Sequence, residues 1–183
     1  MPELKKLIGT SNFKVPSGGQ EWKTKEIILP KLTTIDTFSS NFENRRELRK
    51  IILPCLEPKN STQSIESKTF RDCVWLEALV LGGEKFFPLG STDAFTNTGV
   101  NNTGHNKKFT LYVREYDLNG DNLPEKYKNA STTNWNSVKS LGEVKTIKQF
   151  FEDYDPTYSI YWEYLKNCIP VSEWPENKLN NEE

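Results

Sequence analysis

Residues 107–117, KKFTLYVREYD, contain an alternation of apolar with other side chains, and this pattern constrains the fold more than any other. The apolar members are Phe109, Leu111 and Val113, and the others are Thr110, Tyr112, Arg114 and Tyr116. Successive side chains on a strand point to opposite faces, so the pattern predicts a strand with one apolar face. The other face carries aromatic and arginine side chains, which indicates binding rather than catalysis.

A second strand is predicted at residues 70–87, with a polar loop rich in Gly, Asn and Thr at 90–106 between the two. Two strands joined in this way predict a small antiparallel barrel. A helix is predicted at 32–53, where Pro54 ends it, and a second helix at 144–154. Residues 158–169 form either a strand or a terminal helix, and their alternating aromatic residues favour the strand. The further strands of a five-stranded barrel would come from residues 123–138, and no internal repeats are expected. The expected fold class is therefore mainly β with flanking helices (α+β), built as an antiparallel OB-type barrel.

The bulk composition favours a globular domain with long polar loops. Apolar residues make up 35% of the 183 residues, but aromatic residues reach 12%, and large side chains fill a small core efficiently. We expect an N-terminal arm at 1–31, one OB-fold domain at 32–172, and an acidic flexible tail at 173–183. No apolar run approaches the roughly 20 residues that a membrane span requires, so no membrane contact is expected.

The cysteines and the single histidine indicate neither a metal site nor a cofactor. Cys55, Cys73 and Cys168 are far apart and form no CxxC pair, which predicts buried thiols in a reducing compartment. Together with His105 they number four, but no two have the spacing of a metal site.

Arrangements that would support catalysis are also missing from the sequence. It has no glycine-rich phosphate loop and no nucleophile elbow. The acidic run at 152–155 is typical of a solvated helix end before Pro156, and residues 117–121 lack the glycine and glutamate of a calcium loop. The sequence therefore predicts a protein that is not an enzyme.

Aromatic and basic residues remain as binding candidates. Trp75 on the first strand, with Tyr112, Arg114 and Tyr116 on the second, could stack on nucleotide bases and pair with phosphates. The same side chains could instead pack in the core or bind a protein, because Trp, Tyr and Arg are enriched at protein interfaces. The net charge of −1 argues against a groove that neutralises many phosphates.

Four segments, in this order, resemble the OB-fold modules of telomere end-binding proteins, the protection-of-telomeres family. They are LTTIDTF at 32–38, TFRDCVWLEALV at 69–80, KKFTLYVREYDLNGDNLP at 107–124 and YSIYWEYLKNCIPV at 158–171. The match is best with the C-terminal module of that family. The segment between Pro124 and Val144, where the later barrel strands should lie, departs from the family pattern by being short and weakly patterned.

The resemblance implies a telomere-associated module in the nucleus that binds a protein partner, the bridging subunit of a shelterin-type complex. The partner would dock on aromatic and aliphatic side chains, with Arg114 or the basic cluster at 45–50 at the rim. The residues proposed for this contact are Trp75, Tyr112, Arg114, Tyr161 and Trp162. One alternative is direct binding of single-stranded telomeric DNA through Tyr112, Arg114 and Tyr116. Another is a viral or plasmid-encoded accessory protein of unrelated fold.

Overall fold

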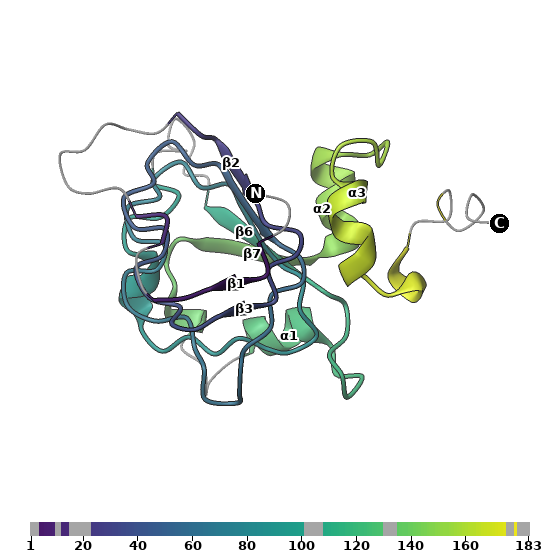
Figure 1. Ribbon diagram of the computed structural model, residues 1–183, viewed down its shortest axis with the longest axis horizontal. Helices are drawn as coiled ribbons and strands as arrows, with labels where there is room; N and C mark the ends of the chain where they lie inside the picture. Colours follow the sequence, from purple (N-terminus) through teal and green to yellow (C-terminus); the bar gives the residue numbers. More distant parts are fainter. Residues whose placement is uncertain are drawn as a thin grey trace.

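The chain winds into a stack of parallel coils, and successive coils add short strands to one sheet (Figure 1). The computed structural model describes residues 4–9, 12–14, 23–100, 108–129, 135–174 and 178. The main sheet has the strand order β2-β4-β5-β6-β7, and every neighbouring pair is parallel. Its strands are β2 (Glu26–Ile28), β4 (Lys50–Leu53), β5 (Ala78–Leu81), β6 (Phe109–Val113) and β7 (Leu141–Thr146).

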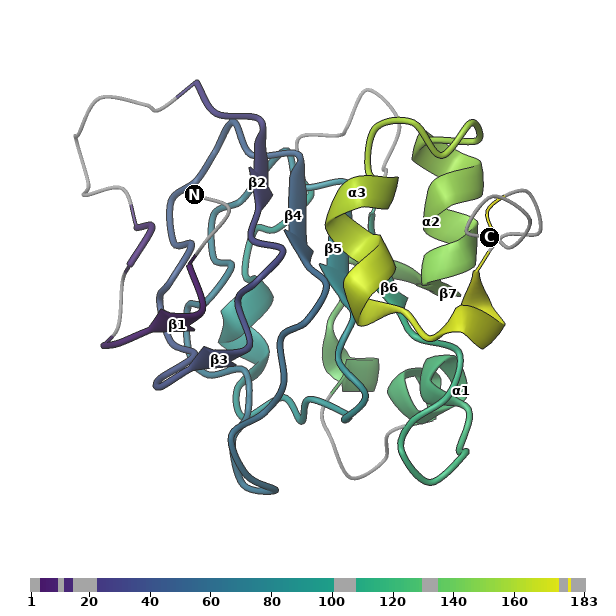
Figure 2. The same ribbon diagram turned by 45° about the vertical axis from the view of Figure 1, so that its right-hand side comes forward.

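A second, two-stranded parallel sheet joins β1 (Lys6–Leu7) to β3 (Thr34–Ile35). The helices are α1 (Leu123–Lys128), α2 (Ile147–Tyr154) and α3 (Trp162–Leu165). Short 3-10 turns are η1 (Thr92–Phe95), η2 (Trp135–Ser137), η3 (Lys166–Cys168) and η4 (Val171–Glu173). Figure 2 shows the main sheet between the β1–β3 pair on one side and α2 with α3 on the other.

The register of the main sheet shows an internal repeat. Ile27 pairs with Ile51, Ile51 with Leu79, Leu79 with Leu111, and Leu111 with Val144, so each coil takes 24 to 33 residues. The same apolar spacing, Leu-x-x-Ile/Leu-x-Leu, occupies residues 48–53 and 76–81. It is the spacing typical of leucine-rich solenoid repeats, in which each repeat buries its apolar side against its neighbours.

A column of phenylalanine rings runs through the interior of the stack. Phe13 stacks on Phe42, Phe42 on Phe70, and Phe70 on Phe95, with ring centroids 5.3, 5.4 and 5.0 Å apart. Phe95 in turn stacks on Phe109 at 5.1 Å. Offset aromatic pairs at these distances add stabilisation beyond the area that they bury.

The turns after Phe42, Phe70 and Phe95 share one backbone feature. Asn44, Asp72 and Asn97, each two residues beyond a stacked ring, have φ values of 62°, 59° and 56°. Asn and Asp tolerate this left-handed region better than most residues do. The turns are also hydrogen-bonded from coil to coil, since Asn97 Nδ2 donates to Asp72 Oδ1 at 2.9 Å. The repeat is therefore specified by turn residues as well as by the core.

The central strands β4, β5 and β6 of the main sheet are largely buried on both faces. The inner face of the sheet joins the core of the coils, whereas Ile52, Ala78, Val80 and Tyr112 on the outer face belong to a separate apolar cluster. The C-terminal segment 147–169, which we call the cover, supplies the other buried members: Ile147, Phe150, Phe151, Tyr161, Trp162, Leu165 and Ile169. Both views show α2 and α3 side by side over this face (Figures 1 and 2).

The predicted antiparallel OB-type barrel is wrong, because every pair of neighbouring strands in the two sheets is parallel and the coils form a β-solenoid. The expectation of no internal repeats is wrong for the same reason. The strand predicted at 107–117 is confirmed as β6, and the helix predicted at 144–154 is confirmed as α2 from Ile147. β2, which lies within residues 1–31, forms one edge of the main sheet.

Four other predictions differ from the structure in whole or in part. Residues 32–53 form β3, a series of turns and β4 rather than a helix, because their apolar residues follow the coil and not a helical face. Only Ala78–Leu81 is a strand within 70–87. The strand favoured at 158–169 is wrong, and the alternative of a terminal helix agrees better with the structure, which has α3 and η3 there. The described part of 123–138 forms α1 and η2 and supplies no barrel strand.

Candidate interaction surface

Tyr112 lies beneath the cover. Its side chain is 1% exposed, and its ring meets that of Phe150 edge to face at 5.2 Å. The hydroxyl donates to Asp153 Oδ2 at 2.7 Å. Burial raises the pKa of Tyr112, and the Asp153 acceptor raises it further. Tyr112 is thus part of the packing between sheet and helix in this conformation.

Tyr161 and Trp162, which were expected to contact a partner, are buried members of the cover. The Tyr161 hydroxyl donates to Glu26 Oε1 at 3.0 Å, which ties α3 to the edge strand β2. Trp162 packs edge to face against Trp174, with centroids 5.1 Å apart. Both side chains hold the chain's own C-terminal segment in place.

Arg114 is 8% exposed and is held by two carboxylates. Its Nη1 lies 2.6 Å from Glu84 Oε1, and its Nε lies 3.3 Å from Glu173 Oε1. Burial raises the pKa of Glu173, although Arg114 and the Glu115 N–H oppose that rise. Tyr116 is 46% exposed, so of the three residues proposed to bind DNA it is the one that solvent reaches readily.

Trp75 is half-buried and lies in the segment that leads into β5. The Arg49 guanidinium, in the corresponding segment before β4, lies 5.3 Å from the centroid of the Trp75 ring. Arg49 also pairs with Glu77, and 40% of its side chain is exposed. A cation over an indole face contributes about 0.5–1 kcal/mol at an exposed site, so the pair fixes the orientation of both side chains.

The coil register brings further side chains alongside this pair. The N–H of Asn44 bonds to Arg71 O at 2.9 Å, and that of Glu77 bonds to Arg49 O at 2.8 Å. The two segments therefore run side by side, and Arg46 and Val74 occupy corresponding positions in the two successive coils. We call the surface formed by Arg46, Arg49, Val74, Trp75 and Glu77 the ridge; each of its side chains is exposed or half-buried.

The sequence indicated Trp75 and the basic cluster at 45–50 as separate features but did not predict their association. Trp75 was a candidate for binding, and Arg49 belonged to the basic cluster at 45–50. Their meeting depends on the coil period, because 26 residues separate them along the chain. The repeated Leu-x-x-Ile/Leu-x-Leu spacing is the signal that could have predicted it.

A cavity of about 600 Å³ opens elsewhere, near η1 and η2. Its lining is hydroxyl-rich: Thr92, Phe95, Thr96, Asn97, Thr98, Gly99, Val100, Lys108, Ser137, Val138, Lys139 and Ser140. The described residues that line it include no carboxylate, histidine or cysteine. Within the described ranges there is also no group of three His, Cys, Asp or Glu side chains placed to hold a metal, and His105 lies outside those ranges.

The cysteines differ from the expectation of three buried thiols. Cys55 and Cys168 form a disulfide, whereas Cys73 is a buried free thiol whose pKa burial raises to about 12. The start of the expected acidic tail is packed, since Glu173 pairs with Arg114 and the Trp174 indole donates to Ile169 O at 3.0 Å.

Among the helices of the described residues, none has the length and apolar character needed to cross a membrane. Comparisons of the chain with protein-family models, with curated proteins and with solved structures gave no match.

Proposed function

We propose that this protein is a non-enzymatic interaction module that binds another protein through the ridge. The observation that supports this most is the Arg49 guanidinium placed over the half-buried Trp75 ring. Trp and Arg are the residue types most enriched among the side chains that dominate binding energy at protein interfaces. A solenoid suits this role, because stacking the coils presents equivalent side chains in a row.

Partner binding is the part of the sequence-based interpretation that we retain. The resemblance to telomere proteins was based on antiparallel barrel strands, and the corresponding segments here are parallel strands, turns and helices. No feature of the ridge points to a telomere complex or to a nuclear location. A disulfide is also uncommon in the nucleus. Single-stranded DNA binding has no comparable support, since Tyr112 and Arg114 are buried.

The test begins with capture of partners from cells that make the protein, using the full chain as bait. Candidate proteins are then purified and titrated directly with wild-type protein, Trp75→Ala and Arg49→Ala. We expect each substitution to weaken binding by about tenfold or more, because loss of a central aromatic or arginine commonly costs 2 kcal/mol.

Lys148→Ala is the matched control, because Lys148 is exposed on α2, outside the ridge. It should leave the affinity unchanged. Circular dichroism establishes that each variant keeps its fold. Equal affinities for wild type, Trp75→Ala and Arg49→Ala would exclude the ridge as the binding surface.

A further inference from the structure

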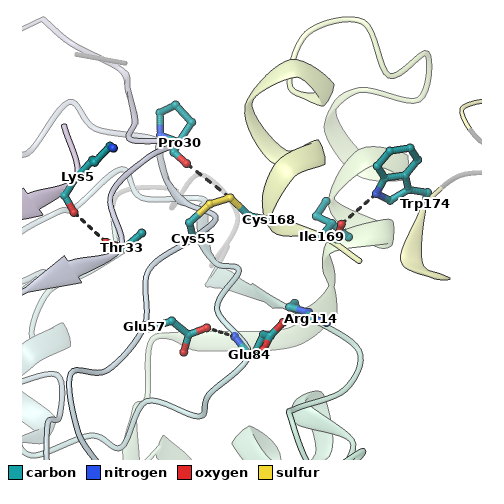
Figure 3. Close-up of a disulfide and its surroundings, with 10 residues drawn as sticks. All are labelled: Lys5, Pro30, Thr33, Cys55, Glu57, Glu84, Arg114, Cys168, Ile169 and Trp174. Atoms are coloured by element: carbon teal, nitrogen blue, oxygen red, sulfur yellow. Dashed lines mark hydrogen bonds and ion pairs between the residues drawn. A yellow bond between two sulfur atoms is a disulfide. The ribbon is translucent and has the colours of Figure 1, made fainter. Parts of the chain in front are cut away.

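The Cys55–Cys168 disulfide joins the cover to the coils (Figure 3). Cys55 lies two residues beyond the end of β4, and Cys168 is the last residue of η3, directly after α3. The two cysteines are 113 residues apart in sequence. The cover is therefore attached covalently at both ends, through the direct junction of β7 with α2 at Thr146 and through this disulfide.

The two ends of the cover are held differently by noncovalent contacts. At the α2 end, Thr146 caps the helix in a capping box with Gln149, and Phe150 packs on Tyr112. The α3 end has a helix of four residues followed by a three-residue 3-10 turn. Helices this short are not stable in water, so their order depends on the surfaces that hold them. Disulfide loss should therefore affect the α3 end most.

A small thiol can reach this disulfide. Cys55 and Cys168 are both half-buried rather than enclosed. Cys73, by contrast, is fully buried, and its sulfhydryl donates to Phe42 O at 3.1 Å. It therefore provides no internal thiolate for exchange. Any exchange must start from a thiol outside the chain.

We propose that the Cys55–Cys168 disulfide is a redox latch that keeps the α3 end of the cover closed over the outer face of the sheet. Two molecules of a low-molecular-weight thiol such as glutathione supply two electrons. The first glutathione thiolate attacks one sulfur of the disulfide and forms a mixed disulfide, which frees the other cysteine. The second glutathione thiolate then attacks the glutathione sulfur of that mixed disulfide and frees the remaining cysteine. The S–S bond breaks, Cys55 and Cys168 become thiols, and glutathione disulfide leaves. The α3 end then opens, and solvent reaches the apolar outer face at Ile52 and Val80.

The latch is closed in an oxidising compartment and opens in a reducing one, where glutathione keeps thiols reduced. The latch lies in another part of the molecule than the ridge, and a separate experiment tests it. The ridge residues supply none of the buried apolar cluster beneath the cover. Failure of the latch would leave the proposed partner binding intact, and the converse also holds.

The experiment is hydrogen exchange measured by mass spectrometry on the full chain, before and after reduction with glutathione. Thiol counting under denaturing, non-reducing conditions first establishes the starting state, which should contain one free thiol, Cys73. On reduction we expect amides at 158–173 to exchange about tenfold faster or more, while those of β4, β5 and β6 keep their protection. The double variant Cys55→Ser/Cys168→Ser should exchange as the reduced protein does without added thiol.

Cys73→Ala is the matched control, because it removes a cysteine and retains the disulfide. It should respond to glutathione as wild type does. Three free thiols in the native protein, or unchanged exchange at 158–173 on reduction, would overturn the latch. Loss of protection in β4, β5 and β6 together with 158–173 would overturn it too, because the disulfide would then stabilise the whole fold rather than one end of the cover.

Discussion

The Tyr112 hydroxyl donates a 2.7 Å hydrogen bond to Asp153 Oδ2, joining strand β6 to helix α2 across the outer face of the sheet. Lys145, on β7, reaches the same carboxylate oxygen at 2.9 Å. Burial alone would raise the pKa of Asp153, but the hydrogen bonds from Tyr112 and Lys145 outweigh it and lower that pKa. One carboxylate thus links two strands to the helix that covers them.

Removing this hydroxyl should destabilise the protein without disturbing the packing of the ring. We expect Tyr112→Phe to lower the free energy of unfolding by about 1–2 kcal/mol, because the lost bond is to a charged acceptor. Urea denaturation followed by circular dichroism measures the change.

A double-mutant cycle with Asp153→Asn separates this bond from other effects. If the loss of stability comes from the Tyr112–Asp153 hydrogen bond, Tyr112→Phe should lower the free energy of unfolding markedly less in the Asp153→Asn background than in the wild type. Additive losses would show that the hydroxyl acts through other contacts.

Tyr112 also shows what the sequence could and could not predict. The alternation at 107–117 correctly predicted a strand, because period two is a local property of the backbone. It could not tell which face meets solvent, since a strand of a parallel sheet is often buried on both faces. Helix α2, some 40 residues later in the chain, covers the face that carries Tyr112. A local sequence pattern cannot predict such a distant contact.

The parallel direction of the strands could have been predicted from the distance along the chain between the apolar runs. Parallel strands need a crossover of a dozen or more residues, whereas antiparallel strands can be joined by a short hairpin. The apolar runs at 51–53 and 79–81 are 28 residues apart, and the phenylalanines at 42 and 70 have the same separation. Together these equal spacings predict a repeat. The ridge, which joins residues of two successive coils, follows from that period.

The phenylalanine column provides a second prediction. Phe70 is fully buried and stacks on Phe42 and Phe95, so Phe70→Ala should leave a cavity in the middle of the stack. We expect a loss of about 3–5 kcal/mol in the free energy of unfolding. Phe70→Leu, which fills more of the space, should cost less. Tyr164→Ala, at a position 39% exposed, is the control and should stay within about 0.5 kcal/mol of wild type.

The Asp155 carboxylate organises the junction between α2 and α3. It is 2% exposed and accepts from the backbone N–H groups of Ser159, Ile160 and Tyr161 at 3.0, 2.8 and 2.8 Å. Burial would raise the pKa of Asp155, but these three donors outweigh it and lower that pKa. The charged form is therefore the one that the fold favours.

Asp155→Asn keeps an acceptor but loses the charge, so we expect it to lower the free energy of unfolding by roughly 1–3 kcal/mol at neutral pH. A lowered folded pKa means that this stabilisation is present above the unfolded pKa of about 3.9 and is lost as the pH falls through the folded value. Urea denaturation of both proteins from about pH 2.5 to about pH 7 follows this loss of stabilisation. The advantage of wild type over Asp155→Asn should shrink toward the acid end, and a constant difference would contradict the role of the charge.

Glu173 gives the opposite pH dependence. Burial raises its pKa above the ordinary value, although Arg114 lies 3.3 Å away and the Glu115 N–H donates at 3.2 Å. The folded protein therefore holds this proton more tightly than the unfolded chain does, and stability falls as the pH rises between the two pKa values. Glu173→Gln removes the titration, so the stability of wild type relative to this variant should decline as the pH rises above the unfolded pKa of about 4.3. Urea denaturation of both proteins at matched pH measures that difference. A relative stability that rises with pH would mean that Arg114 outweighs burial at this carboxylate.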